Sequence, residues 1–222
     1  MPDSYTPTKR SKVKRLHQRG HYDKETVFGI LDRNPLGHVG YVIDGQPYVT
    51  PTLQWREGDR VYWHGSSASR MLRTVKGGIP ATLTVTRFNG FVLARSPFHH
   101  SANYESAMLF GTAHPVEGRA AKERSLEIMM EHFFPGRWAE LRGNTEQEMK
   151  ATLVVSMEIE EASAKIRTGA PVDDDEDYDT VAAWAGVLPL ESHWGQPVDD
   201  GRLKPGVAVP GYLSAPKVFG EG

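Results

Sequence analysis

The chain is punctuated by turn signals that lie between segments of alternating apolar and polar residues. Asp44-Gly45 lies between residues 39–43 and 48–53, and both of its residues tolerate the positive φ angles of a two-residue hairpin turn. Asn89-Gly90 lies between residues 82–88 and 91–95 and is the clearest signal of this kind. The pattern predicts antiparallel strands joined by tight turns.

Other segments add strands and a few helices. Helical spacing predicts a short helix that Asp23 caps and that ends at Asn34-Pro35, and a longer helix over residues 119–133. Thr145 and Glu148 form the pattern of a capping box. The predicted strands cover residues 39–43, 48–53, 60–64, 82–88, 91–95, 104–116 and 152–160. The chain is therefore expected to be mainly β (α+β), with about six or seven strands in a small barrel and two or three peripheral helices.

Composition excludes several classes of protein. The chain has 222 residues, which predicts one large domain with a substantial core. It has no cysteine, so thiol catalysis, thiolate metal sites and disulfides are excluded. A net charge of −2 gives the whole molecule no nucleic-acid signature. No apolar segment approaches the roughly 20 residues that span a bilayer, and no signal peptide is evident, so we expect a soluble cytoplasmic protein.

The ends of the chain differ from its middle. Residues 1–20 are polar and irregular and predict an arm, whose basic cluster over residues 9–15 is interpreted as solvated. Residues 21–196 form the predicted domain, and residues 197–222 predict an extended tail rich in proline and glycine. The acidic run over residues 173–179 lacks the glycine and ligand spacing of a calcium loop and is interpreted as a solvated turn.

The strongest chemical signal begins where the strand over residues 60–64 ends. Gly65 is followed by Ser66, Ser69 and Arg70 at the expected start of a short helix that Gly77-Gly78 closes. Free N–H groups and the positive end of a helix dipole attract anions, and an arginine donates a forked pair of hydrogen bonds to phosphate. An N-cap serine beside a surface arginine gives the same local pattern, so both interpretations stay open on this pattern alone.

A second polar segment runs from Phe98 to Ser106. His99 and His100 are adjacent, and in an extended strand neighbouring side chains point to opposite faces, so the pair is not expected to chelate one ion. Hydroxyl and amide groups between apolar strands indicate one polar wall of a pocket. The tryptophans are interpreted as core or interface residues, and no GxSxG motif supports a hydrolase.

Taken in order, these pieces resemble one family. They comprise Gly37-His-Val-Gly-Tyr, Asp44-Gly-Gln-Pro-Tyr-Val-Thr-Pro, Tyr62-Trp-His-Gly-Ser, Ser69-Arg70, Phe98-His-His-Ser, Asn103-Tyr-Glu-Ser, Pro135-Gly-Arg-Trp, Ala162-Ser-Ala-Lys-Ile-Arg and Trp184-Ala-Gly-Val-Leu-Pro. Over residues 9–213 the chain is similar to the pyridoxamine 5′-phosphate oxidase-like split β-barrels, in their flavin-nucleotide-binding, nitroimidazole-reductase-like branch.

The resemblance implies a homodimer with FMN at the subunit interface. Ser69 and Arg70 match the family's phosphate-binding pair, but Met71 replaces the lysine that follows in pyridoxamine phosphate oxidases, and Lys76 is the nearest substitute. This departure argues against pyridoxamine phosphate as the substrate. The implied flavin contacts are Thr50, Tyr62, Trp63, His64, Gly65, Ser66, Ser69, Arg70, Lys76, Ser101, Tyr104 and Ser106 in one subunit, and Arg137, Trp138, Lys165, Arg167 and Trp184 in the other.

The resemblance favours an FMN-dependent oxidoreductase acting on a small organic molecule, aromatic or nitro-containing, with NAD(P)H as a candidate electron donor. His64, His99 and Tyr104 are the candidate proton donors. One alternative is a flavin carrier or sensor without turnover. Another is a haem-binding or haem-degrading split barrel, which the nine histidines permit without identifying an axial ligand. No metal site is predicted.

Replacing Arg70 tests the phosphate interpretation. Arg70→Ala removes a charged hydrogen-bond donor, so the affinity for the flavin nucleotide should fall about 10- to 100-fold. Flavin titration followed by fluorescence measures the change. Unchanged affinity would refute the assignment of Arg70 to the phosphate.

Overall fold

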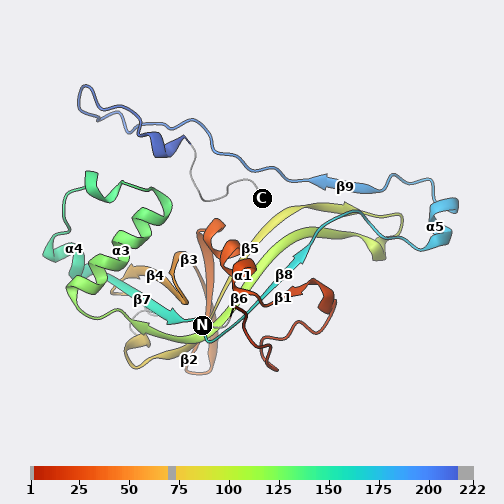
Figure 1. Ribbon diagram of the computed structural model, residues 1–222, viewed down its shortest axis with the longest axis horizontal. Helices are drawn as coiled ribbons and strands as arrows, with labels where there is room; N and C mark the ends of the chain where they lie inside the picture. The colour runs from red at the N-terminus through yellow and green to blue at the C-terminus, as the bar shows by residue number, and fades with distance from the viewer. Residues whose placement is uncertain (1–2, 70–73, 215–222) are drawn as a thin grey trace.

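The computed structural model describes residues 3–69 and 74–214. Nine strands form one antiparallel sheet in the order β1-β8-β6-β7-β4-β3-β2-β5-β9, and β6 pairs with β5 as well. This extra pairing closes the sheet into a barrel (Figure 1). The mainly β split-barrel fold expected from the sequence is confirmed.

The strands are β1 (Gly20–His21), β2 (Leu36–Ile43), β3 (Gln46–Glu57), β4 (Arg60–Ser66), β5 (Ile79–Leu93), β6 (Ser101–Pro115), β7 (Thr152–Glu158), β8 (Glu161–Arg167) and β9 (Gly186–Pro189). The described helices are α1 (Lys24–Arg33), α3 (Arg119–Phe133), α4 (Glu146–Ala151) and α5 (Asp175–Thr180). Short 3₁₀ turns cover His17–Arg19 (η1), Val75–Gly77 (η2), Pro97–His99 (η3), Trp138–Glu140 (η4) and Gly211–Leu213 (η5).

The main core fills the barrel. Alternate residues of the strands point inward, among them Val39, Leu83 and Leu109, all fully buried. Helix α1 packs onto the same core, and its predicted cap is confirmed because the Asp23 side chain accepts from the Thr26 N–H. The buried apolar stripe of Val27, Ile30 and Leu31, together with the capped N-terminus, explains why these ten residues form a helix here.

A smaller core lies outside the barrel. Helix α3 covers β3, β4 and β7, and there Trp55, Phe133 and Val154 are buried together. The helix predicted over residues 119–133 is therefore confirmed, as is the capping box of α4 between Thr145 and Glu148. The outer face of the sheet is thus split into a part under α3 and a part that α3 leaves open.

The turn predictions have different outcomes. Asp44 and Gly45 have φ angles of 51° and 78° and join β2 to β3, as predicted. The hairpin predicted at Asn89-Gly90 is wrong, because both residues lie inside β5, which pairs with β6 through a bulge there. Gly90 is required by a close approach: an added Cβ would lie 2.4 Å from the Leu188 carbonyl oxygen of β9.

Three strands were not predicted. The segment expected as one strand over residues 152–160 ends at Glu158, and β8 then pairs with β6. Strand β1, at the end of the N-terminal arm, pairs with β8, and β9 pairs with β5. Each of these three strands has two to seven residues, so alternation along any one of them is too short to be distinctive.

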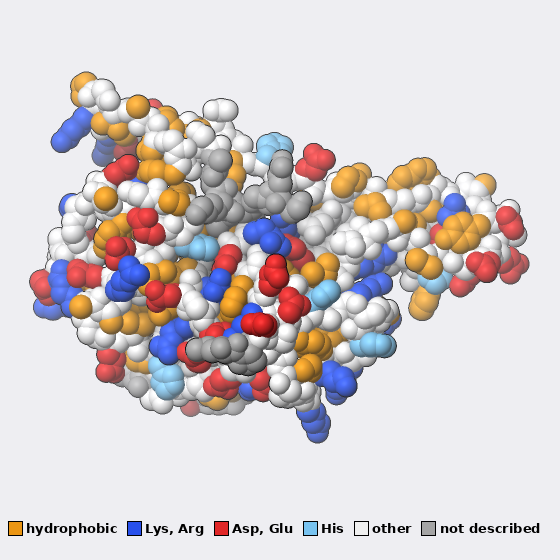
Figure 2. Space-filling view, in the orientation of Figure 1, with side chains coloured by type: hydrophobic (Ala, Val, Ile, Leu, Met, Phe, Trp, Pro, Cys, Tyr) orange, Lys and Arg blue, Asp and Glu red, His pale blue; other side chains and the backbone are white. Residues whose placement is uncertain are grey.

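The outer halves of β5 and β6 continue beyond the barrel as an arm, with β9 along its edge and α5 at its end (Figure 1). Acidic side chains gather at this end (Figure 2). The solvated turn predicted over residues 173–179 is wrong, because residues from Asp175 onward form α5. Asp173 is moreover buried, and its carboxylate accepts from Arg95 Nη1 at 3.0 Å. That ion pair fixes the acidic segment to the arm.

The C-terminal segment returns from the arm to the other end of the molecule (Figure 1). After β9, residues 190–209 have no helix or strand and are exposed. The Tyr212 hydroxyl then donates to Glu140 at 2.8 Å and accepts from Arg137 at 3.1 Å, beside the end of α3. The expected extended tail is therefore held at its far end. No helix among residues 3–69 and 74–214 is long and apolar enough to cross a membrane.

Gly111 provides a test of the barrel closure. An added Cβ would lie 2.2 Å from the Glu158 carbonyl oxygen, where β6 crosses towards β7. Gly111→Ala should lower the free energy of unfolding by about 1–3 kcal/mol, because the backbone cannot move away without breaking strand pairs. Gly143→Ala, with nothing within 4 Å of the added atom, is the control. Equal urea midpoints for the two variants would contradict this account.

Candidate functional site

Strand β4 carries five of the predicted flavin contacts, and its alternation separates their side chains. The Trp63 side chain is 1% exposed and lies in the barrel core. Thr50 lies on the inner face of β3, where its hydroxyl is 3.0 Å from the Tyr41 hydroxyl. These two side chains take part in packing inside the barrel, whereas Tyr62 and His64 lie on the outer face.

His64 is partly buried on that outer face. Its ring centroid lies 5.7 Å from that of Trp55, and Val154 is its partner on β7. Burial lowers the pKa of His64 below its ordinary value of 6.5, so the neutral imidazole is favoured. Its Nδ1 is buried and has no hydrogen-bond partner among the described residues. A neutral imidazole whose nitrogen has no hydrogen-bond partner can bind a ligand or a cofactor at that nitrogen.

The serine segment continues directly from β4. Gly65 and Ser66 still pair with β7, and the Ser69 N–H then donates to the Ser66 carbonyl at 2.9 Å to form a tight turn. The Ser66 hydroxyl accepts from the Ala68 N–H at 3.3 Å. Arg70 lies outside the described residues, and so does the predicted helix start that follows it. The side chain of Lys76 is likewise not described, so the phosphate interpretation stays a prediction.

The predicted residues on β6 and β8 come together within one chain. Ser106 is the register partner of Lys165, and Tyr104 is the partner of Arg167. Ser101 lies further along the arm, opposite Val92 of β5. The resemblance implied that the two basic residues reach the flavin from the second subunit, whereas here they form one polar edge with the hydroxyl groups of their own chain.

The remaining predicted residues are dispersed. Arg137 pairs with Glu140 at 3.0 Å and Trp138 begins η4, both next to the end of α3. Trp184 is 70% exposed and precedes β9 on the arm, at the opposite end of the molecule (Figure 1). One chain therefore does not gather all of the implied contacts around one point.

The two adjacent histidines lie in the turn η3 and at the residue after it. His99 Nε2 is 3.2 Å from an Asp174 carboxylate oxygen, and His100 Nδ1 is 2.8 Å from the Ser96 carbonyl oxygen. Each ring is thus occupied separately at the end of the arm. Among the described residues, no group of three metal-ligating side chains occurs.

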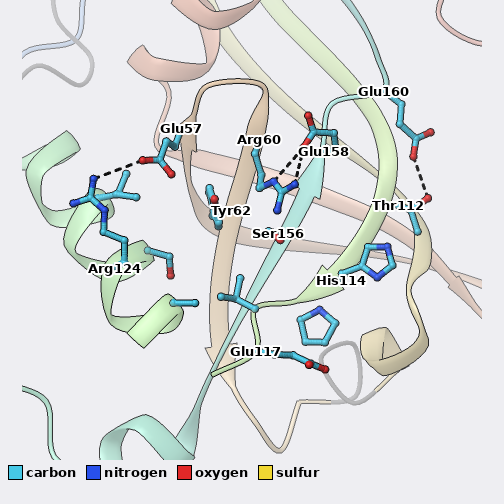
Figure 3. Close-up of a pocket in the computed structure, with 15 residues that line it drawn as sticks. Glu57, Arg60, Tyr62, Thr112, His114, Glu117, Arg124, Ser156, Glu158 and Glu160 are labelled. Atoms are coloured by element: carbon cyan, nitrogen blue, oxygen red, sulfur yellow. Dashed lines mark hydrogen bonds and ion pairs between the residues drawn. The ribbon is translucent and has the colours of Figure 1, made fainter. Parts of the chain in front are cut away.

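A cleft that the sequence did not indicate lies between α3 and the outer face of β4, β6 and β7 (Figure 3). Its volume is about 740 Å³, and Tyr62 is the one predicted site residue in its lining. Glu57 and Arg124 approach to 3.7 Å across it, Arg60 and Glu158 pair at 2.9 Å, and burial, then Glu57, raises the pKa of Tyr62. Four glutamates line the cleft, so it is unfavourable for the phosphate of a flavin.

The open part of the outer face is unusually apolar. Leu36 of β2, Val49 and Leu53 of β3, and Met108 of β6 are between 43% and 68% exposed on this face, with β5 between β2 and β6. Exposed apolar side chains gathered on one face of a sheet mark an interaction surface. Sequence patterns missed it because β2 and β3 alternate normally and apolar residues occupy both of their faces.

Comparisons place these features among known proteins. A family model described as pyridoxamine 5′-phosphate oxidase matches residues 23–166. The chain is similar to the flavocytochrome Anf3 from Azotobacter vinelandii, with 43% identity, 98% of this chain and 100% of that chain covered, and a TM-score of 0.90. It is also similar to an FAD and haem binding protein from Mycobacterium smegmatis, with 37% identity, 88% and 96% covered, and a TM-score of 0.82.

A putative 5-nitroimidazole antibiotic resistance protein from Bacteroides thetaiotaomicron shares the fold, with 21% identity, 65% of this chain and 84% of that chain covered, and a TM-score of 0.55. A search of curated proteins gives no match. The family predicted from the order of motifs is confirmed.

The buried imidazole leads to a pH-dependent stability. Because the pKa of His64 is lowered in the folded protein, the unfolded chain binds a proton at this residue at a higher pH. The free energy of unfolding should fall as the pH decreases below about 6.5, and His64→Gln should remove this part of the fall. Urea unfolding on either side of that pH measures it. The exposed-histidine variant His100→Gln should behave as wild type, and an unchanged profile for His64→Gln would exclude the effect.

Proposed function

The chain belongs to the pyridoxamine 5′-phosphate oxidase-like family of flavin-binding split barrels, and we propose that it is a cytoplasmic, homodimeric redox protein that binds a flavin and a haem. The carrying observation is the full-length similarity to a flavocytochrome, at 43% identity over 98% of the chain. The family model matches residues 23–166, whereas this similarity also extends over the N-terminal segment and over the residues that follow β8.

Flavin binding follows the family, and the nature of the flavin is the finer question. The relative that is 37% identical is described as binding FAD. We therefore favour FAD over the FMN expected from the sequence. In either case the turn at Ser66–Ser69 leads into the segment in which Arg70 is predicted to hold a phosphate.

The residues of this chain fit a haem at His64. A neutral imidazole would bind the iron of a haem, and burial favours the neutral form of this ring. Its unsatisfied Nδ1 indicates that the described residues do not complete its surroundings. Leu53, its neighbour across β3, is 45% exposed and begins the apolar face on which a flat porphyrin edge could pack. His64 is therefore the residue that we propose to bind the iron.

The apolar face also supports a homodimer. Leu36, Val49, Leu53 and Met108 would lie in water in an isolated chain. Burying such a face against a second copy is favourable by about 25 cal/mol per Å² of apolar surface. The predicted contacts that one chain leaves dispersed, such as Arg137 and Trp184, would then meet the site of the other subunit.

When bound, the flavin and the haem would supply two-electron and one-electron redox chemistry. The chain's own residues supply binding and a low-dielectric setting around His64. NAD(P)H remains the proposed electron donor, and a small organic molecule the proposed acceptor. The second candidate, a flavin carrier without turnover, differs only in lacking an acceptor.

The visible spectrum of the purified protein tests the proposal. We expect two flavin bands and a Soret band, and FAD as the nucleotide released on denaturation. His64→Ala should lose the Soret band, because it removes the proposed iron ligand. His100→Ala, at the end of the arm, should keep the Soret band and the flavin bands.

A protein without flavin would contradict the proposal, and one with flavin but no Soret band would limit it to the flavoprotein. Gel filtration of the same sample should give a dimer, and a flavin-loaded monomer would exclude the interface model. Oxidation of NAD(P)H with reduction of a nitroaromatic or quinone acceptor would separate the oxidoreductase from the carrier.

A further inference from the structure

The N-terminal arm places a basic segment against β8. Tyr5 is buried and its hydroxyl donates to Asp59 at 3.0 Å, and the Val13 N–H donates to the Tyr22 hydroxyl at 2.8 Å. Strand β1 then pairs with β8. The basic cluster that the sequence left as a solvated arm is therefore fixed on the barrel.

A small cavity of about 230 Å³ lies between this N-terminal segment and the outer face of β6 and β8. Four hydroxyl side chains line it, together with three cationic ones, and none of its lining residues is acidic: Arg10, Ser11, Lys12, Val13, Thr84, Ser106, Met108, Phe110, Ser163 and Lys165. Hydroxyl donors and cations without carboxylates form an anion-binding environment.

The three cations are not equivalent. Arg10 is neutralised, because its guanidinium pairs with Glu161 at 2.6 Å and lies over the Phe110 ring. Lys12 and Lys165 make no ion pair with any described residue. Lys12 is exposed and Lys165 is half-buried, so these two lining lysines supply positive charge that no described carboxylate pairs with.

A third uncompensated charge lies two residues further along β8. Arg167 is only 7% exposed, and its guanidinium donates to Asn103 and to the carbonyl oxygens of Gly169 and Ala170, none of them charged. Its Nε is buried without a partner among the described residues. Burial and then repulsion from Arg19 lower its pKa.

An unpaired buried cation is costly, and such groups are retained where another charge completes them. Arg33, Arg56 and Arg95, which are also partly buried, each pair with a carboxylate. Arg167 differs from them in having no acidic partner among the described residues. The missing negative charge is therefore expected from a ligand at this edge of β8.

We propose that this cavity, with Arg167 beside it, binds the phosphate groups of a dinucleotide. At about 230 Å³ it holds phosphates and not a whole ligand, since pockets for whole ligands begin near 300 Å³. This rests on the proposed function only for the source of the phosphates, which is either the FAD or a pyridine dinucleotide electron donor.

The test uses the protein as purified, with Lys165→Gln and Arg167→Gln as variants and Arg60→Gln as the matched control. Arg60 is on the outer face of β4 and is already paired with Glu158 at 2.9 Å. Lys165→Gln changes a residue near the surface and covers the case in which Arg167→Gln fails to fold. The measurements are the affinity for inorganic pyrophosphate and NADPH by calorimetry, and the rate of FAD release on dilution.

If the cavity and Arg167 hold the phosphates of FAD, both variants release FAD about 10- to 100-fold faster, because a charged phosphate contact is lost. If it holds the electron donor, FAD release is unchanged, and the affinities for pyrophosphate and NADPH fall by a similar factor. Either result supports the phosphate site, and Arg60→Gln should match wild type in both. The pyrophosphate titration does not require bound flavin, so it remains informative if the flavin proposal fails.

Two results would overturn the proposal. One is unchanged binding of pyrophosphate, NADPH and FAD in both variants. The other is loss of haem alone, which would assign the charges to haem carboxylates in place of phosphates.

Discussion

The pairing of β5 with β6 is the interaction on which the rest of the structure depends. Both strands have 15 residues, and they stay in register from Ile79 to Val92 apart from the bulge at Gly90. The inner half of this ladder closes the barrel, because β5 also pairs with β2 and β6 with β7 and β8. The outer half forms the arm and presents an edge to β9. One continuous pair of strands thus positions the cavity at β8, the open apolar face and the start of the tail.

The two Asx-Gly pairs show what local sequence can predict. Asp44-Gly45 adopts positive φ angles in a turn, and Gly90 adopts a positive φ angle inside a strand. The dipeptide signals the conformation in both cases. Whether the chain reverses there depends on β6 and β9, which flank β5 on both sides at this point. That information is not local, so the arm could not be predicted from the turn.

The sequence likewise predicted some parts of the candidate site and not others. Motif order identified the family and the segment after β4, and alternation separates His64 from Trp63 once the pairing of β4 with β3 and β7 is known. The uncompensated charge of Arg167 could not be predicted, because it depends on which carboxylates lie near it in space. The same holds for the basic N-terminal segment, since its place on β8 is shown by the hydrogen bond from Arg10 to Glu161 and by the pairing of β1 with β8.

The tail behaves as a closed loop and not as a free end. Its start is fixed by the pairs between β9 and β5, and its end by Tyr212 between Arg137 and Glu140. Holding both ends of a loop costs entropy that grows only slowly with its length, so about 20 intervening residues can stay in place with few contacts of their own. Two hydrogen bonds at Tyr212 and its ring contact with Phe134 therefore help to hold the far end of the segment. Without them this end of the segment would be held less firmly to the end of α3, while the pairs with β5 still fixed its start.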